Sequence, residues 1–429
     1  MSPSLSTLFA ESLKIGCLGF GGPAGQIALM HRVFVDERKW IDDDRFQHML
    51  AFCMLLPGPE AQQLATYIGW RLRGWAGALI AGWMFVLPGA LVVLALSWLY
   101  VNYGEVPLAA AAFDGVKCAV VALVAEALFK VGKRALKASI ALWIAIATFI
   151  ALVLGAPFPL VIVAAAVIGI LFPSPLAGEG REGGRSVSAD VSDRPPPPTP
   201  PRKGAGSQAV LWLVLWLTPP ALIALTLGTD HVLFQLALLF SILACVTFGG
   251  AYALLAYLTT EAAARGWLTP EQMIDGLGLA ETTPGPLILV NEFVGFLAGW
   301  NAGSLTLALA GAAIALWCTF APSFVWIFAG APHAERLERN RHATGALAAI
   351  TAAVLGVIAK LALFFAAHAL FARQVAFGPT QLPDLTSGIW WMIALALLAA
   401  VALIRFKANL LLVLAVCALA GLAAHASGL

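Results

Sequence analysis

Four Gly/Pro motifs, each inside an apolar run, are the residues of this chain best suited to binding chemistry. They are Phe20-Gly21-Gly22-Pro23, Pro57-Gly58-Pro59, Phe248-Gly249-Gly250 and Pro284-Gly285-Pro286. A helix that starts at such a break points unpaired N–H groups and the positive end of its dipole into the space beyond it. Proline suits the first turn of that helix, and glycine lets a ligand approach the backbone. We therefore expect these motifs to form a cradle for an anion.

The motifs recur in the same order in the two halves of the chain. A tryptophan precedes each Pro-Gly-Pro motif, and the interval from Trp40 to Pro57 equals that from Trp267 to Pro284. Breaks at corresponding places in two halves indicate a transporter site built from discontinuous helices. Close helix packing is the competing interpretation of any single motif, because glycine also serves that purpose in membranes. Recurrence in both halves favours the binding site.

Polar side chains next to the motifs add candidates. Glu60 and Gln62 follow the first Pro-Gly-Pro motif, and Asn291 and Glu292 follow the second. An ionisable group within a membrane segment is a functional candidate by default, so we consider Glu60 and Glu292 as proton-coupling residues. A carboxylate at an interface or a helix N-terminus is the alternative for each.

Lys117 is a further candidate for contact with an anion. It lies three residues after Asp114, so the two share a helix face, and a structural ion pair is the competing interpretation.

Composition places the chain in a membrane. The hydrophobic fraction is 61% and the charged fraction 11%, against about 45–50% and about 25% in soluble domains. The net charge of +2 gives no indication of nucleic-acid binding. The six cysteines show no metal-binding spacing, so we expect no metal or cofactor. No Walker A, GxSxG or HExxH motif occurs, and we expect no enzymatic activity.

The apolar runs divide the chain into four parts. Residues 1–172 form an N-terminal membrane repeat, and residues 173–208 form a Pro/Gly/Ser-rich linker that we expect to be disordered. Residues 209–230 hold one extra transmembrane helix, and residues 231–429 form the C-terminal repeat. The predicted fold is an all-α polytopic membrane protein with two inverted repeats.

The distribution of basic residues predicts that inversion, because short basic loops favour the cytoplasm. In four pairs of corresponding loops, one loop is richer in basic residues than its counterpart in the other half, and all four differences are those that inversion predicts. The basic loops contain Arg71 and Arg73; Lys130, Lys133, Arg134 and Lys137; Arg336, Arg339 and Arg341; and Arg405 and Lys407. The N-terminus and linker are then cytoplasmic and the C-terminus periplasmic. Each repeat would contain two re-entrant hairpins and about four full spans; single broken spans are the alternative.

These motifs, in this order over nearly the whole chain, resemble those of the chromate ion transporter family in its long, two-domain form. The resemblance implies a multi-pass carrier of the bacterial inner membrane that exports chromate, driven by the membrane potential or the proton gradient. It also implies about thirteen hydrophobic segments in two oppositely oriented halves. The second half departs from the first, with Ala251 in place of Pro23 and Leu287 in place of Glu60.

We therefore predict a secondary transporter that moves a tetrahedral oxyanion dianion by alternating access. Its predicted partners are chromate or sulfate, protons and the lipid bilayer, without nucleic acid; a homodimer is compatible with the sequence. Sulfate transport stays open because sulfate has the shape and charge of chromate. A membrane enzyme acting on a lipid-linked phosphate is the alternative from another class.

Overall fold

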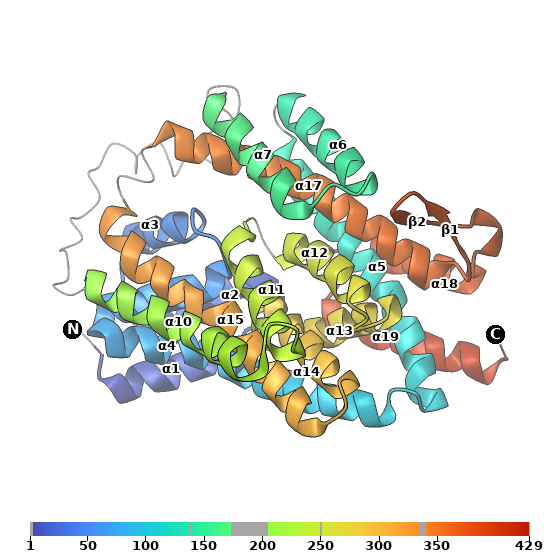
Figure 1. Ribbon diagram of the computed structural model, residues 1–429, viewed down its shortest axis with the longest axis horizontal. Helices are drawn as coiled ribbons and strands as arrows, with labels where there is room; N and C mark the ends of the chain where they lie inside the picture. The colour runs from blue at the N-terminus through green and yellow to red at the C-terminus, as the bar shows by residue number, and fades with distance from the viewer. Residues whose placement is uncertain (1–2, 137–138, 173–204, 249–250, 335–339, 429) are drawn as a thin grey trace. The chain divides into compact units, whose positions relative to one another are not determined.

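The chain is almost wholly helical. The computed structural model describes residues 3–136, 139–172, 205–248, 251–334 and 340–428. Within these ranges five helices are long and apolar enough to cross a membrane: Glu60–Tyr103, Pro107–Lys133, Gly206–Leu227, Leu305–His333 and Arg341–Leu370. Six shorter apolar helices accompany them. The protein is thus an all-α polytopic membrane protein, as the composition predicts (Figure 1).

The first half begins with short helices and continues with long ones. Its elements are α1 (Leu5–Leu18), α2 (Gly22–His31), η1 (Arg32–Glu37), α3 (Asp43–Cys53), α4 (Glu60–Tyr103), α5 (Pro107–Ala135), α6 (Ser139–Val153) and α7 (Phe158–Leu171). The helices on either side of residues 19–21 have 14 and 10 residues, against the roughly 20 that a span requires. This segment is therefore broken into two short arms.

The second half repeats this order after one extra helix. Its elements are α10 (Ala205–Leu227), α11 (Val232–Val246), α12 (Ala251–Ala264), α13 (Pro270–Thr282), η2 (Leu287–Leu289), α14 (Val290–Asn301), α15 (Leu305–Gly330), η3 (Ala331–His333), α17 (Arg341–Leu370), β1 (Gln374–Phe377), β2 (Thr380–Pro383), η4 (Leu385–Ser387), α18 (Trp390–Ile404) and α19 (Leu410–Ala426). Here α11 to α14 are again short, with 12 to 15 residues each.

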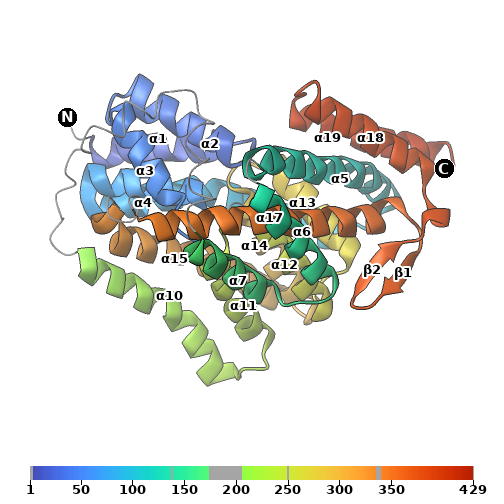
Figure 2. The same cartoon turned by 90° about the horizontal axis from the view of Figure 1, so that it is seen from above.

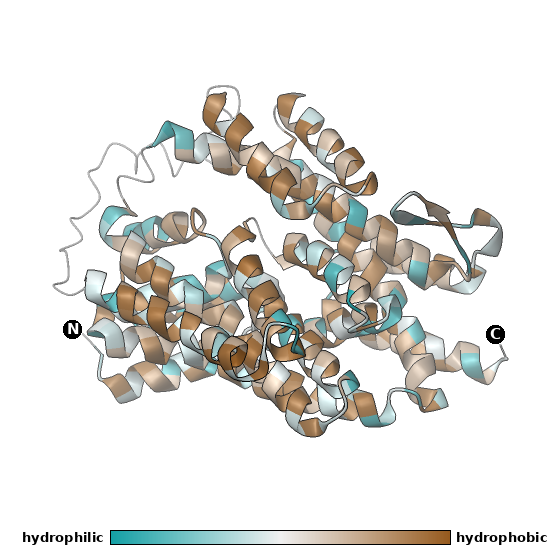
Figure 3. Ribbon diagram, viewed as in Figure 1, coloured by the Kyte–Doolittle hydropathy of each residue, from teal (hydrophilic) through white to brown (hydrophobic). Residues whose placement is uncertain are grey.

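The extra helix α10 carries much of its apolar surface on the outside. Leu225 is 84% exposed, and most of the neighbouring leucines and valines are exposed as well. The hydropathy colouring of Figure 3 shows that α10 is apolar over much of its length. An exposed apolar face of this size suits contact with lipid. The helix starts at Ala205, so residues 205–208, predicted as the end of the linker, are helical instead; residues 173–204 lie outside the described ranges.

The chain folds into two compact units that do not follow its sequence halves. Unit 1 contains Met1–Leu94, Ile168–Ala251 and Thr283–Ala348, and unit 2 contains Ala95–Val167, Tyr252–Thr282 and Ala349–Leu429. Each unit therefore draws segments from both repeats. All four Gly/Pro motifs belong to unit 1, and of Phe248-Gly249-Gly250 the structure describes Phe248.

Unit 1 contains two helical hairpins closed by glycine pairs. In α4 the backbone leaves helical geometry at Arg73 and Gly74, and beyond this turn Gly77 packs against Gly69. In the second half α14 turns into α15, and Gly295 packs against Gly311. A Cβ atom on any of these four glycines would overlap a backbone carbonyl of its partner. In both halves the arm after Pro-Gly-Pro therefore runs back along the helix that follows it.

An aromatic chain fills the core of unit 1 next to these hairpins. Ring centroids lie 5.9 Å apart for Trp70 and Phe328, and 4.3 Å apart for Trp212 and Phe324. Trp70 is 1% exposed although it stands at a segment end, where a membrane-belt role is the simple expectation. Its burial shows that it packs between helices.

Unit 2 has a core of small and aliphatic side chains where α5 packs against α18 and α19 (Figure 2). The core residues are Ala119, Ala122, Leu123, Ala399, Leu403, Val413, Leu414 and Cys417. Gly115 on α5 allows a close approach, because a Cβ there would overlap the carbonyl of Cys417. As elsewhere in membranes, small residues permit helix contact.

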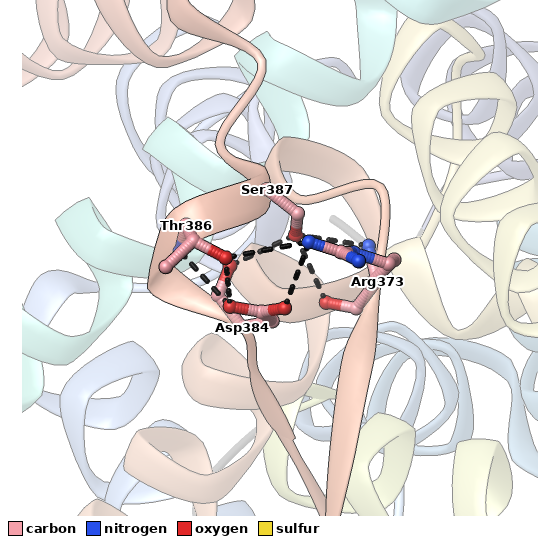
Figure 4. Close-up of polar contacts among 4 residues, drawn as sticks. All are labelled: Arg373, Asp384, Thr386 and Ser387. Atoms are coloured by element: carbon pink, nitrogen blue, oxygen red, sulfur yellow. Dashed lines mark hydrogen bonds and ion pairs between the residues drawn. The ribbon is translucent and has the colours of Figure 1, made fainter.

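A β-hairpin, which the sequence analysis did not predict, connects α17 to α18 in unit 2. Strands β1 and β2 pair in antiparallel register, with Gly378 in the left-handed region at their turn. At its base Arg373 lies 3.3 Å from the carboxylate of Asp384, beside Thr386 and Ser387 (Figure 4). The hydroxyl and backbone N–H of Thr386, together with this arginine, hold the pKa of Asp384 below its ordinary value.

The polar loop after α2 is organised by His31. Its imidazole lies 2.7 Å from Asp43 and 3.4 Å from Asp36. The hydrogen bond to Asp43 and the charge of Asp36 raise the pKa of His31 despite partial burial, and the same hydrogen bond lowers the pKa of Asp43. In the same loop Arg38 forms an ion pair with Glu11 of α1, so the loop is tied to the first broken segment.

Gly295→Ala should destabilise the protein by about 1–3 kcal/mol, since the new methyl overlaps backbone that cannot move aside. Gly132→Ala is the matched control: it lies inside α5, and its Cβ would meet only ordinary contacts at 3.7 and 3.9 Å. Loss of glycine's backbone entropy should leave that variant as stable as the wild type or more so. Thermal unfolding in detergent measures both; equal stabilities would disprove the packing role of Gly295.

His31→Gln should remove a pH-dependent stabilisation of about 0.2–1 kcal/mol, the range of partly exposed ion pairs. Because the folded pKa of His31 is raised, its contribution is complete below the ordinary value of about 6.5 and is lost as pH rises through the folded pKa. The contribution of Asp43, whose folded pKa is lowered, disappears in acid instead. The stability gap between wild type and variant should therefore be widest in mildly acidic solution. The exposed His425→Gln variant serves as control, and a gap independent of pH would contradict the assignment.

Candidate functional site

The four breaks pair two by two in unit 1, and each pair joins the two halves of the chain. The N–H of Gly285 donates to the carbonyl of Gly19 at 3.0 Å, and the N–H of Gly58 donates to the carbonyl of Thr247 at 2.8 Å. Gly19 and Thr247 each stand directly before a Phe-Gly-Gly sequence, and Gly58 and Gly285 are the central residues of the two Pro-Gly-Pro motifs. The two hydrogen bonds are therefore equivalent under the internal repeat.

The proline-containing long helices complete both pairs in the same way. Gly89 on α4 packs against Pro284, while Ser323 on α15 lies near Gly58, 3.8 Å from where its Cβ would be. Each residue directly follows the proline inside its helix, Pro88 or Pro322. Each Pro-Gly-Pro break thus contacts the residue directly before the Phe-Gly-Gly sequence of the opposite half, and the long helix of that half.

The two pairs lie near each other because α4 and α15 cross between them. A Cβ on Gly82 would lie 2.8 Å from the ring of Phe324, the residue after Ser323. Gly82 is seven residues before Gly89, which corresponds to about 10 Å of helix. All four breaks therefore fall within one region of unit 1.

Two glutamine side chains donate hydrogen bonds to the breaks, and Gln26 joins two of them. The amide of Gln26 is fully buried and donates to the carbonyls of Gly19, at 3.1 Å, and Gly285, at 2.6 Å. The amide of Gln63 donates to the carbonyl of Pro57 at 2.6 Å. The sequence analysis did not select Gln26; a polar residue three positions after Pro23 within an apolar run was the available signal.

The predicted amides Gln62 and Asn291 are also buried, and their N–H groups are engaged. Gln62 donates to the hydroxyl of Thr66 at 3.3 Å, and Asn291 donates to that of Thr319 at 2.9 Å. Among the described residues the oxygen of each amide has no hydrogen-bond partner. In this conformation the two side chains offer acceptors, so binding of an oxyanion by either one requires its amide to turn.

The two predicted carboxylates differ in their surroundings. Glu60, the first residue of α4, is half-buried. Glu292 is 4% exposed on the first turn of α14, and within the described ranges its Oε2 has no hydrogen-bond partner. A buried carboxylate without a partner is costly as an anion, so Glu292 is the better suited of the two to carry a proton.

The backbone at the breaks is partly open and partly closed. The N–H groups of Gly58 and Gly285, predicted to face a ligand, are already donated to carbonyls. By contrast, Gly21 and Gly22 adopt φ values of +86° and +71° at the start of α2, and a Cβ on either would meet nothing within 4 Å. The first Gly-Gly break, with Phe20 38% exposed and Pro23 in the first turn, is therefore open.

Three of the predicted site residues are not seen in the region around the breaks. Gly249 and Gly250 lie outside the described residues, although the half-buried Phe248 before them is described. Lys117 belongs to unit 2, where its ammonium lies 2.8 Å from Asp114. The structural pairing that the sequence left open is therefore present.

Comparison with known proteins identifies relatives over most of the chain. The family model for the chromate transporter matches residues 6–170 and 234–422, one region in each half. A chromate transport protein of Pseudomonas aeruginosa is 33% identical over 83% of this chain and 79% of its own length.

Two further relatives cover the chain as fully. A probable chromate transport protein of Synechococcus elongatus is 30% identical over 83% of both chains. A chromate transport protein of Cupriavidus metallidurans is 29% identical over 94% of this chain and 89% of its own. No solved structure matches this chain. The paired breaks thus belong to a known class of membrane transporter, and the chain is a member of the chromate transporter family.

Proposed function

We propose that this protein is a secondary transporter that exports chromate across the bacterial inner membrane. Family membership makes it a transporter rather than an enzyme, which removes the lipid-phosphate alternative. The relatives named as chromate transport proteins support chromate as the substrate. Sulfate has the same charge and shape and is the competing substrate.

The pair of equivalent hydrogen bonds between the breaks is the observation that supports this proposal best. Each bond closes one Pro-Gly-Pro break of one half against the Gly-Gly break of the other. Two such contacts related by an inverted repeat can exchange roles, one open while the other is closed, which is the geometry that alternating access requires. The free energies of the two arrangements then differ little, because each has the same contacts in opposite halves.

The substrate site in this proposal centres on the first Gly-Gly break. Its backbone from Phe20 to Pro23 opens α2, and the positive end of that helix faces unfilled space beyond Gly21 and Gly22. The first Pro-Gly-Pro break, residues 57–59, and its counterparts at 248–250 and 284–286 complete the cradle when the inter-half bonds open. Gln62 and Asn291 turn their amides toward the anion at that step, and Lys117 offsets charge along the pathway.

The proton gradient or the membrane potential supplies the driving force in this proposal, with Glu292 and Glu60 as carriers near the breaks. The proposed organisation is that of two inverted repeats, residues 1–172 and 231–429, joined by a cytoplasmic linker and one helix. The ion pair of Arg373 with Asp384 supports this orientation. It neutralises the arginine in a loop that the basic-residue pattern assigns to the periplasm.

Inside-out membrane vesicles test the function directly. Vesicles with the protein should accumulate radiolabelled chromate, and a protonophore that collapses the gradient should abolish the accumulation. Excess unlabelled sulfate measures selectivity: strong inhibition by sulfate would favour a general oxyanion carrier. Vesicles that take up no chromate beyond the protein-free background would disprove the proposal.

Gly58→Val and Gly21→Val should each lower chromate transport at least about tenfold while the protein still inserts. A side chain at Gly58, with φ +109°, is strained and would lie 3.1 Å from the Gln63 amide, and one at Gly21 would enter the open space. Gly228→Val is the matched control, because its φ of +87° and empty surroundings equal those of Gly21 away from the breaks. Full chromate resistance in cells carrying either break variant would refute the cradle.

A further inference from the structure

Unit 2 contains two clusters of charged residues, and Lys117 is the one member of them that the proposed mechanism uses. The Asp275 cluster consists of Asp275 on α13, Tyr100 on α4, and Asp114 and Lys117 on α5. Its central carboxylate belongs to Asp275, which a hydropathy profile does not assign to a membrane segment because α13 is short and amphipathic. Its partners come from two other helices of the unit, α4 and α5.

Asp275 is the buried centre of its cluster. Its side chain is 5% exposed, and Oδ2 accepts a hydrogen bond from the hydroxyl of Tyr100 at 2.8 Å. Oδ1 is also buried and, within the described part of the chain, has no hydrogen-bond partner. Lys117 and Asp114 face it from α5, and Glu271 lies one turn away on α13. Helix α19 also packs against α13 but contains no Asp, Glu, Lys or Arg.

The Glu281 cluster repeats this composition nearer the other end of α13. Glu281 is 9% exposed and accepts a hydrogen bond from the hydroxyl of Tyr252 on α12 at 2.8 Å. Glu126 and Lys130 face it from α5 and are 2.7 Å apart. Between the two clusters Gly278 brings α13 against Val116 of α5.

Both clusters have the same charge imbalance. Each, as described, combines two carboxylates and one lysine with a tyrosine that donates to the more buried carboxylate. With every carboxylate ionised, the four members of each cluster have one net negative charge; Glu271, which is exposed to solvent, is not counted among them. An uncompensated charge in a low-dielectric region is strongly unfavourable. Uptake of one proton makes each cluster neutral, so both are suited to bind and release a proton.

The clusters also lie at different depths along the helices: Asp275 and Glu281 are six residues apart on α13, about 9 Å. Asp114 and Glu126 are twelve residues apart on α5, about 18 Å along the helix, against about 30 Å of hydrocarbon. Each cluster reaches the surface through one member: the side chain of Asp114 is 46% exposed and that of Lys130 is 68% exposed. Basic residues gather at the C-terminal end of α5, whereas the loop directly before it, residues 104–106, has none, so by the basic-residue rule the Asp275 cluster is nearer the periplasm.

We propose that Asp275 and Glu281 are further sites for the coupling proton, in addition to Glu292 and Glu60 near the breaks: the proton enters from the periplasm at Asp275 and leaves to the cytoplasm at Glu281. This inference rests on the proton-driven transport proposed above. At Asp275 the proton adds to Oδ1, giving a neutral carboxylic acid, while Oδ2 keeps its hydrogen bond from Tyr100. Tyr100 and Tyr252 are positioning residues, and Lys117 and Lys130 form ion pairs with the second carboxylate of each cluster.

The test separates coupling from substrate movement in proteoliposomes that hold the purified full-length protein and a lumenal pH dye. Exchange of radiolabelled for unlabelled chromate at equal pH needs no net proton movement, whereas accumulation under an imposed pH gradient does. We expect Asp275→Asn and Glu281→Gln to keep exchange within about twofold of wild type and to lose gradient-driven accumulation at least about tenfold. The exposed loop variant Asp230→Asn should keep both activities.

Several outcomes would overturn the proposal. The proposal fails if both variants keep gradient-driven accumulation. It also fails if Glu292→Gln alone loses accumulation, because coupling would then depend on the carboxylate at the breaks. A parallel loss of exchange in a folded variant would indicate a substrate role. Wild-type accumulation that does not respond to the imposed pH gradient would show that no coupling proton exists.

An infrared pH titration of the purified protein keeps this proposal separate from the proposed function, because it needs no chromate. Wild type should show a carbonyl band of a protonated carboxylic acid that is reduced in Asp275→Asn and in Glu281→Gln. Absence of chromate exchange in wild type would disprove the transport function, yet the band would still decide whether these sites bind a proton. An unchanged band in both variants would refute the sites.

Discussion

Hydrogen bonding of backbone groups at helix breaks is the constraint on which this structure depends. Within a membrane an unpaired N–H or C=O group has no water to bond with and must find a partner in the protein. Here the N–H groups of Gly58 and Gly285 find carbonyls in the opposite half of the chain. Neither half can satisfy its own breaks in this way, so the two repeats are obliged to pack together and their motifs are obliged to meet.

That pairing is possible only because the helices around the breaks approach very closely. Association of helices in lipid relies on van der Waals packing, since lipid tails provide no hydrophobic driving force between them. Gly69 with Gly77 and Gly295 with Gly311 bring helix backbones into direct contact in the two halves. These contacts hold each Pro-Gly-Pro arm against its long helix and thereby set the position of the break at its tip.

The buried polar groups of unit 1 differ in kind from those of unit 2. Around the breaks of unit 1 the side chains are mostly neutral amides and hydroxyls, with Glu292 as the fully buried carboxylate described there. Unit 2 contains the mixed clusters of carboxylates, lysines and tyrosines. Neutral groups suit a site that must take up and release a doubly charged guest, whereas charged clusters suit the binding of a proton.

Composition and the repeated motifs by themselves determined the membrane class, the family and the places where helices break, because hydropathy and Gly/Pro interruptions are local properties of the chain. They also predicted the Asp114–Lys117 pair, which is local on one helix. The tertiary structure alone decided which break meets which, that Gln26 joins two of them, and that Asp275 and Glu281 lie opposite α5. These contacts join residues up to 259 positions apart. No periodicity or spacing along one sequence encodes them, since they depend on how the helices of the two repeats pack.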